Sequence, residues 1–201
     1  RTGWNRSAIE RAENGSVALN LRPTQEGAEK DFVGAEIQRS ERTHFGEYEV
    51  IMTAARGNGI ISSFFTYTGP YFGDPHEEID FEFLGRDTTK VWLNRFVDGE
   101  KLPGRWIDLG FDAADAPQLY RLDWLPDRLV WYVNGRELMR ITADETSIPQ
   151  LPQRIYLNIW AGGPGKVGWS GSAPDDDEAA ARYYCVSYGQ TGSDETMCSG
   201  A

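Results

Sequence analysis

Acidic side chains alternate with bulky apolar ones in the segment 76–83, which reads HEEIDFEF. Glu78, Asp80 and Glu82 occupy every second position, and in a β-strand such positions point to the same face. The positions between them hold isoleucine or phenylalanine, which we expect to pack into a core on the other face. Because three carboxylates on one face repel one another, stability alone does not explain the pattern. It indicates chemistry.

Two carboxyl groups that flank a glycosidic bond are the usual equipment for hydrolysing it. One stays ionised and attacks the anomeric carbon, while the other stays protonated and gives its proton to the departing oxygen. Mutual repulsion across a shared face helps to separate the two pKa values. Asp80, which lies between the two glutamates, would hydrogen-bond the attacking carboxylate. A solvated outer face or a calcium-binding acidic patch would show the same alternation.

The spacing of Glu78 and Glu82 also constrains the shape of the sheet. On a flat strand, residues four positions apart are separated by about 13 Å at the backbone. A mechanism that retains the anomeric configuration needs carboxyl groups about 5–5.5 Å apart. We therefore expect this strand to lie on a concave sheet, with its side chains leaning toward one another.

The rest of the chain reads as short strands separated by turn residues, which is typical of an antiparallel sandwich. No window of more than about ten residues shows clean helical periodicity. The segment 177–182 would form one helical turn at most, and 162–178 and 189–201 are predicted to be loop and tail. Asn134–Gly135 is a strong hairpin signal. The predicted strands are 16–23, 46–55, 59–70, 76–83, 90–99, 118–138 (two strands), 154–163 and 181–189.

Composition is consistent with one all-β domain over residues 1–201. Of the 201 residues, 40% are hydrophobic and 12% aromatic, enough for a substantial core. A net charge of −11 argues against nucleic acid and anionic membranes as partners. There is no run of 18 apolar residues and Arg1 does not begin a recognisable signal peptide. We expect a monomer that needs no redox or nucleotide cofactor.

The two cysteines, Cys185 and Cys198, flank a flexible segment rich in glycine, serine and threonine. A disulfide between them would contribute about 3 kcal/mol on a loop-entropy estimate. If it forms, it favours an extracellular or periplasmic location. Metal binding is the poorer alternative, because His44 and His76 lack the spacing of a zinc site.

Beyond the acidic motif, the sequence GIISSFFTYTGP…HEEIDFEFLGRDTTKVWLN resembles the central part of glycoside hydrolase family 16. It is most similar to bacterial lichenases (endo-1,3-1,4-β-glucanases) and to succinoglycan-depolymerising endo-glycanases. The similarity extends over nearly the whole chain, through GAEIQRSERTHFGEYEV and RIYLNIWAG. It implies a β-jelly-roll sandwich of two antiparallel sheets with a concave substrate cleft. By position, Glu78 resembles the nucleophile, Asp80 its supporting carboxylate and Glu82 the general acid/base.

The resemblance also implies which side chains line the cleft. Trp124 and Trp131 are expected in the core, whereas Trp106 and Trp169 are left unassigned. A structural calcium ion held by backbone carbonyls is compatible with the family. The candidate substrate-binding residues are Glu36, Gln38, Phe65, Tyr67, His76, Asn94, Asn158 and Trp160.

Several positions depart from the lichenase pattern. Lichenases have an arginine where this chain has Gln38, a tryptophan where it has His76, and a cysteine where it has Gly34. The isoleucine–glutamine pair at 37–38 is more like the succinoglycan-type enzymes. The chain also lacks the extra residue within the acidic motif that laminarinases carry.

These features predict a secreted or periplasmic retaining endo-β-glycanase that acts on β-1,3-1,4-glucan. The alternatives are an exopolysaccharide (succinoglycan-type) endo-glycanase and a xyloglucan-type transglycosylase, in which a sugar hydroxyl replaces water. A carbohydrate-binding jelly roll without catalytic activity is the remaining alternative. The presence of both Glu78 and Glu82 disfavours it.

Overall fold

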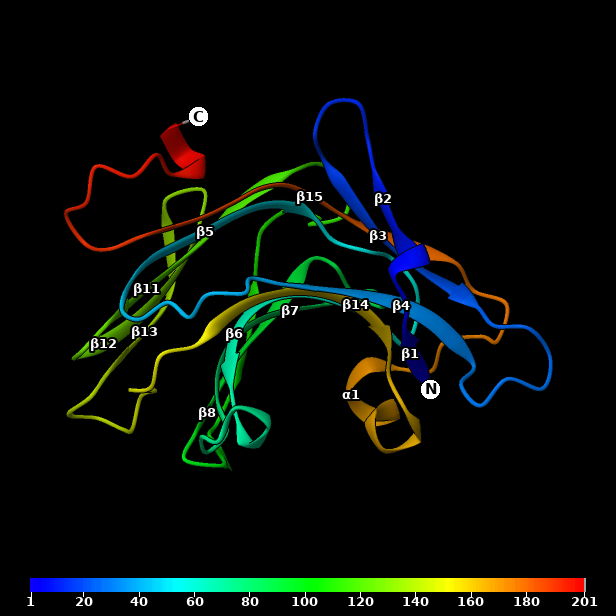
Figure 1. Cartoon of the computed structure of the whole chain (residues 1–201), viewed down its shortest axis with the longest axis horizontal. Coiled ribbons are helices and arrows are strands. Elements are labelled where there is room, and N and C mark those ends of the chain that lie inside the picture. The colour runs from blue at the N-terminus through cyan, green and yellow to red at the C-terminus, as the bar shows by residue number, and fades with distance from the viewer. Residues whose placement is uncertain (201) are drawn as a thin grey trace.

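A computed structural model describes residues 1–200 and shows two nested layers of β-strands that curve into an arch (Figure 1). All the strands belong to one continuous hydrogen-bonded sheet that folds over on itself. The inner layer contains, in order, β10 (Arg105–Asp108), β8 (Lys90–Val97), β7 (Glu77–Leu84), β6 (Ile60–Thr68), β14 (Arg154–Ala161) and β4 (Phe32–Gln38). The outer layer continues with β3 (Val17–Pro23), β15 (Ala179–Gly189), β5 (Gly46–Thr53), β11 (Gln118–Leu125), β12 (Arg128–Val133) and β13 (Arg136–Thr142).

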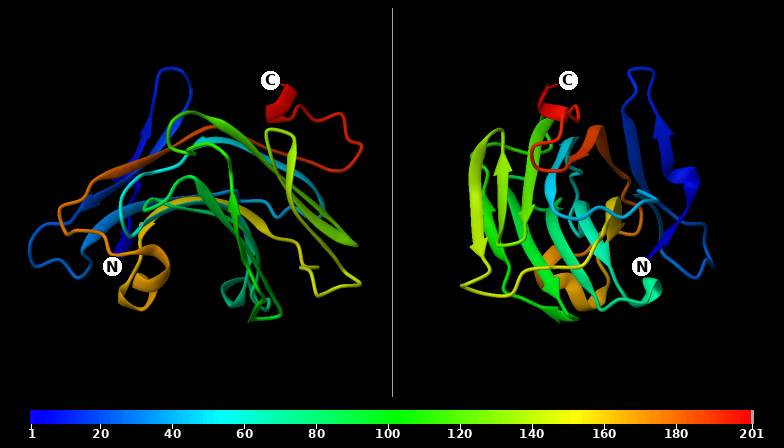
Figure 2. Two further views of the ribbon diagram at one scale, coloured as in Figure 1. Left: turned by 180° about the vertical axis from the view of Figure 1, so that it is seen from behind. Right: turned by 60° about the vertical axis from the view of Figure 1, so that its left-hand side comes forward.

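Short elements complete the arch. Figure 2 shows α1 and the turn η2 on opposite sides of its opening. The short strands are β1 (Thr2–Trp4), which pairs parallel to β4, β2 (Ile9–Arg11) and β9 (Glu100–Lys101). The helical elements are α1 (Val167–Ser170) and the 3₁₀ turns η1 (Arg6–Ala8), η2 (Pro70–Phe72), η3 (Pro164–Lys166) and η4 (Cys198–Gly200).

The predicted two-layer antiparallel architecture is confirmed, with corrections at its edges. The prediction missed the short strands, β10 and also β4, whose sequence FVGAEIQ does not alternate cleanly. The segment 162–178, expected to be loop, contains η3 and α1. The segment 177–182 forms no helical turn, because β15 begins at Ala179 and pairs there with β3. Region 118–138 holds β11, β12 and the start of β13, and Asn134–Gly135 is the turn between the last two.

The core lies between the two layers and holds β7 in place. Trp124 and Trp131 are fully buried, as expected. The Trp131 indole Nε1 donates a hydrogen bond to the backbone oxygen of Asp80 at 3.2 Å, so the outer layer fixes β7 from behind. The single hydroxyl hydrogen of Tyr183 is likewise shared between the backbone oxygens of Ser63 (2.9 Å) and Asn158 (3.1 Å).

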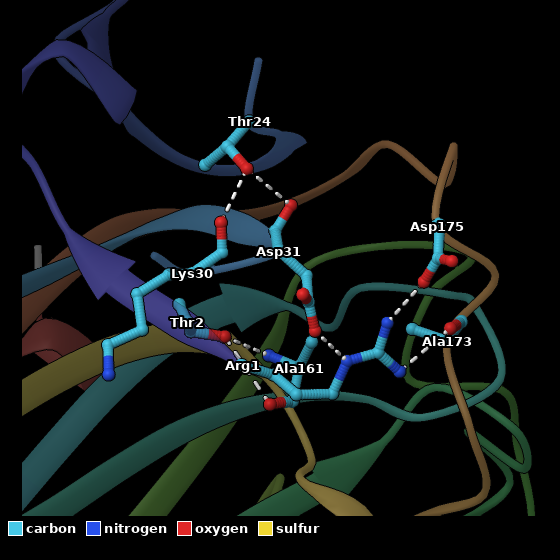
Figure 3. Close-up of polar contacts among 8 residues, drawn as sticks. All are labelled: Arg1, Thr2, Thr24, Lys30, Asp31, Ala161, Ala173 and Asp175. Atoms are coloured by element: carbon cyan, nitrogen blue, oxygen red, sulfur yellow. Dashed lines mark hydrogen bonds and ion pairs between the residues drawn. The ribbon is translucent and has the colours of Figure 1, made fainter. Parts of the chain in front are cut away.

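The N-terminal residues tie together segments that border the opening of the arch (Figure 3). The Arg1 guanidinium contacts Asp31 at 2.7 Å, Asp175 at 2.6 Å and the carbonyl of Ala173 at 3.0 Å. Thr2 Oγ1 accepts a hydrogen bond from the Ala161 amide at 2.9 Å. These contacts anchor the end of β14 and the loop that follows α1.

The disulfide that the sequence left open is present between Cys185 and Cys198, on the outer layer. It fastens η4 against β5 and β15, where the Ser199 amide also donates to the buried Glu49 carboxylate at 2.9 Å. None of the helices found in residues 1–200 is long and apolar enough to cross a membrane.

Candidate active site

The concave face of the inner layer gathers side chains into three rows that run across the strands. Residues paired directly across antiparallel strands point to the same face, so the register defines each row. The Glu82 row contains Glu36, Asn158, Ser63, Glu82, Trp92 and Trp106. The Asp80 row contains Gln38, Tyr156, Phe65, Asp80 and Asn94. The Glu78 row contains Arg154, Tyr67, Glu78, Phe96 and Lys101.

The register places the predicted carboxylates together, one in each row. Ile79, Phe81 and Phe83 point the other way and are at most 1% exposed, which confirms the predicted alternation. The curvature expected from the Glu78–Glu82 spacing is also present, because β7 lies in the inner curve of the arch (Figure 1).

The predicted cleft residues lie on the same concave face. All of them except His76 and Trp160 belong to one of the three rows, and Trp160 follows Asn158 by two positions on β14. Two hollows of about 390 and 380 Å³ meet at Glu78 and form one continuous cleft. The first is lined by Glu78, Asp80, Glu82, Asn94, Phe96, Lys101, Trp160, Gly165, Lys166 and Trp169. The second is lined by Glu36, Gln38, Phe65, Tyr67, Tyr71, Phe72, Glu78 and Tyr156.

His76 contacts a carboxylate directly. Its Nε2 lies 2.5 Å from Oε2 of Glu78. The imidazole stacks on Phe96 with ring centroids 4.2 Å apart, and Tyr67 meets it edge-on at 5.2 Å. The sequence analysis placed His76 among the candidate substrate-binding residues, and the structure adds a hydrogen bond to Glu78.

Asp80 is the most deeply buried of the three carboxyl groups, at 2% exposure. Burial, and then the neighbouring charges of Glu78 and Glu82, raise the pKa of Asp80 well above its ordinary value. A hydrogen bond to Glu78 raises that pKa further, because only a protonated carboxyl group can donate to a carboxylate. A neutral Asp80 can thus hold an ionised Glu78 in place.

Glu82 keeps part of its side chain open to the cleft, yet protein surrounds its carboxyl group. Burial, followed by the charge of Glu78, raises the pKa of Glu82 to about 8. Lys101 and Lys166 oppose that increase. A glutamate with this pKa is protonated at neutral pH and is able to donate a proton, which is the state that a general acid requires.

Glu36, at the far end of the Glu82 row, accepts a hydrogen bond from the Asn158 side chain at 3.3 Å. Burial raises the pKa of Glu36, and the Asn158 hydrogen bond partly offsets this effect. Polar groups held in this way on the cleft floor are suited to hydrogen-bonding sugar hydroxyls.

The structure reveals functional candidates that the sequence analysis missed. Lys101 and Lys166 enter the cleft from a two-residue strand and a 3₁₀ turn, and no local sequence pattern predicts that they line it. Trp169, left unassigned, lines the pocket beside Trp160, and their ring centroids are 6.3 Å apart. Glu77 has a structural role, because its Oε2 accepts the amide hydrogens of Gln150 and Leu151, both at 2.8 Å.

Another hollow, of about 440 Å³, lies elsewhere, among β4, β14 and β15. It is lined mainly by apolar side chains, and no aspartate or glutamate is among its lining residues in the described part of the chain. Hydrolysis of a glycosidic bond needs paired carboxyl groups, so the concave face fits the predicted chemistry and this hollow does not.

Comparison with known proteins agrees with this geometry. The chain is 46% identical over 151 residues to a beta-glucanase of Bacillus amyloliquefaciens, matching 75% of this chain and 62% of that protein. It is 40% identical over 157 residues to a beta-glucanase of Brevibacillus brevis, matching 77% and 59%. The matches thus span about three-fifths of these relatives. A crystal structure of a prokaryotic beta-1,3-1,4-glucanase (lichenase) derived from a mouse hindgut metagenome superposes with a TM-score of 0.86 at 37% identity, covering 92% of this chain and 84% of that one.

The model of the Glycosyl hydrolases family 16 matches residues 1–183, nearly the whole chain. The acidic strand, the concave cleft and the similarity to solved glucanases all lead to the same assignment. The chain belongs to glycoside hydrolase family 16.

Proposed function

We propose that this protein is a retaining endo-β-glycanase that hydrolyses β-1,3-1,4-glucan. The observation that carries the proposal is that Glu78, Asp80 and Glu82 lie side by side on the cleft face of β7, with the pKa of Glu82 raised to about 8. The beta-glucanase relatives and the lichenase structure support this choice of substrate.

In the first step, an oxygen of the Glu78 carboxylate attacks the anomeric carbon, and a bond forms between them. The bond from that carbon to the glycosidic oxygen breaks, and this oxygen takes the proton of Glu82 as the leaving sugar departs. Asp80 and His76 hold Glu78 by hydrogen bonds during the attack. In the second step, water gives a proton to Glu82 and attacks the same carbon, which releases Glu78. Two inversions retain the configuration.

An exopolysaccharide with acidic substituents is the second candidate substrate, because of the charges in the cleft. Lys101 and Lys166 are two of only four lysines in a chain of net charge −11. Within residues 1–200, the other two pair with carboxylates, Lys30 with Glu29 at 3.1 Å and Lys90 with Asp87 at 3.5 Å. Among the described residues neither cleft lysine has such a partner, so both are available to a carboxylate on the substrate.

The first test is the release of reducing ends and the product ladder from barley β-glucan, lichenan, laminarin, xyloglucan and succinoglycan. The variants are Glu78→Gln and Glu82→Gln, with Glu137→Gln as a matched control because Glu137 is exposed on outer strand β13. We expect barley glucan and lichenan to be cleaved by wild type and control, with losses of several orders of magnitude in the two cleft variants. Cleavage of succinoglycan alone would select the second substrate, and products longer than the donor would indicate transglycosylation. Wild type that cleaves none of the five would overturn the proposal.

Azide separates the roles of the two glutamates. In Glu78→Ala, azide attacks the substrate directly, and the glycosyl azide should have inverted configuration. In Glu82→Ala, azide attacks the glycosyl-enzyme formed on Glu78, and the product should retain its configuration. The opposite assignment of products would exchange the two roles.

We also infer that the protein works in an oxidising compartment, outside the cytosol. The Cys185–Cys198 disulfide supports this inference, since such bonds are rare where thiols are kept reduced. Quantifying free thiols in protein isolated from its native source under alkylating conditions would test it, and two free thiols per chain would contradict it.

A further inference from the structure

Two tryptophans extend the Glu82 row to the edge of the inner layer. Trp92 on β8 is paired directly with Glu82, and Trp106 on edge strand β10 is paired directly with Trp92. Their ring centroids lie 5.1 Å apart with planes at 57°. An aromatic pair therefore adjoins the glutamate that we assign as general acid.

These side chains do not belong to the core. On the neighbouring positions, Val91 is fully buried and Ile107 packs against the core, so Trp92 and Trp106 point to the concave face. Trp106 is 39% exposed. Single exposed aromatics are common on protein surfaces, but this one packs at a tilt against a second tryptophan, and that tryptophan is the direct cross-strand neighbour of Glu82.

The strand edge is shaped to hold the Trp92 indole. A Cβ atom on Gly104 would lie 2.5 Å from Cζ2 and 2.8 Å from Cε2 of that ring. Only glycine lets the indole pack this closely against the β10 side, which fixes its orientation. Lys101 Nζ lies 6.0 Å from the centroid of the same ring.

The position of this pair determines what it would bind. Glu82 gives its proton to the oxygen that departs with the leaving sugar, so the groups beside Glu82 along its row lie next to that sugar. We propose that Trp92 and Trp106 form a stacking surface for the glucosyl units on the leaving-group side of the cleaved bond. Beyond Trp106 a hollow of about 270 Å³, lined by Arg86, Lys90 and Asp108 among others, continues the surface along the edge.

The physical basis is the match between indole faces and sugar C–H faces. An indole offers a large apolar area, and burying it against the sugar C–H face removes both from water. A stacking surface of this kind binds ground state and transition state alike, so its loss raises KM more than it lowers kcat. It also holds an acceptor sugar where water would attack, which favours transfer at high oligosaccharide concentration.

The inference rests on the proposed hydrolase activity, and a pair of substrates tests it. One is the β-glucan polymer, and the other is an oligosaccharyl β-fluoride that carries the same glycon but no leaving-group sugar. The variants are Trp106→Ala and Trp92→Ala, with Trp106→Phe as the conservative change. Tyr132→Ala is the matched control, because Tyr132 is a partly exposed aromatic on outer strand β12.

We expect both alanine variants to lose roughly tenfold in kcat/KM on the polymer, mainly through KM, with less than about twofold change on the fluoride. Trp106→Phe should recover most of the loss, and Tyr132→Ala should match wild type. At alkaline pH, kcat/KM should fall at the same pH in Trp106→Ala as in wild type. A shift in that pH would mean that the Trp106 side chain acts through the proton of Glu82. Folding of each variant is checked by its melting temperature.

Each other outcome overturns the inference in a recognisable way. If wild type cleaves the polymer and Trp106→Ala cleaves it equally well, the stacking surface is wrong and the proposed function stands. Equal losses on polymer and fluoride would give the pair a role outside the leaving-group side. If wild type cleaves no β-glucan, the proposed function fails and this inference falls with it.

Discussion

His76 and Glu78 are joined by a hydrogen bond of 2.5 Å between Nε2 and Oε2. Two residues apart on the chain, they meet because the imidazole is sandwiched between Phe96 and Tyr67. The contact engages one oxygen of the carboxylate that we assign as nucleophile. His76 therefore acts as a positioning residue.

Replacing His76 by alanine should lower kcat on β-glucan roughly tenfold to a hundredfold, because a hydrogen bond to a charged group contributes about 1.5–3 kcal/mol. KM should change little if the bond matters mainly for the attack. His44→Ala is the control, since His44 is the only other histidine and bonds the Gln150 carbonyl at 2.8 Å, away from the carboxylates. Equal effects of the two substitutions would refute a specific role for His76.

The pKa of Glu82 predicts the alkaline limb of activity. A general acid must be protonated in the free enzyme, so kcat/KM should fall as pH rises through about 8. Lys101 and Lys166 lower this pKa, so replacing either by methionine should move the limb to higher pH. Lys30→Met, remote from the pocket, should leave the limb in place. If neither lysine substitution moves the alkaline limb, Glu82 is not the group whose ionisation causes it.

The sequence predicted the two faces of β7 better than it predicted the outline of the fold. Alternation in β7 was enough to assign one face to carboxylates and the other to the core, because a strand has a period of two. The spacing of Glu78 and Glu82 also explained why this strand needs a curved sheet. The succession of strands followed from turn residues, and the missed β10 is only four residues long.

Local sequence patterns could not predict which residues form each row on the concave face. The Glu82 row joins Glu36 to Asn158 and Trp106, which are distant in sequence and are brought together only by the register of six strands. The resemblance supplied Glu36 and Asn158, whereas Trp106 remained unassigned. Lys101 and Lys166 come from short connecting elements, where neither period nor propensity predicts direction.

The raised pKa of Glu82 also predicts that the site costs stability at alkaline pH. The unfolded chain releases this proton near its ordinary value of 4.5, but the folded chain retains it until about pH 8. Because the folded state binds more protons between these limits, its stability should fall as pH rises through that window. Glu82→Gln removes this effect, so its melting temperature relative to wild type should increase from pH 5 to pH 9. A constant difference would show that Glu82 titrates alike in both states.

The Cys185–Cys198 disulfide is a stability element rather than part of the site. Its 13-residue separation predicts a contribution of about 3 kcal/mol on the loop-entropy estimate. For a chain of this length, its loss should lower the melting temperature by about 6–12 °C. The double variant Cys185→Ala, Cys198→Ala should show this shift, and dithiothreitol should reproduce it only in wild type.

Activity at 25 °C should survive that double substitution, because the bond lies on the outer layer while the carboxylates face the cleft on the inner one. The Ser199 amide keeps its 2.9 Å contact with Glu49, and Cys198→Ala preserves the backbone amide that donates to Ser187 Oγ at 3.0 Å. These contacts hold the tail in part and limit the loss. Initial rates on β-glucan, measured well below both melting temperatures, check this separation. A fall in kcat that parallels the fall in melting temperature would connect the outer layer to catalysis.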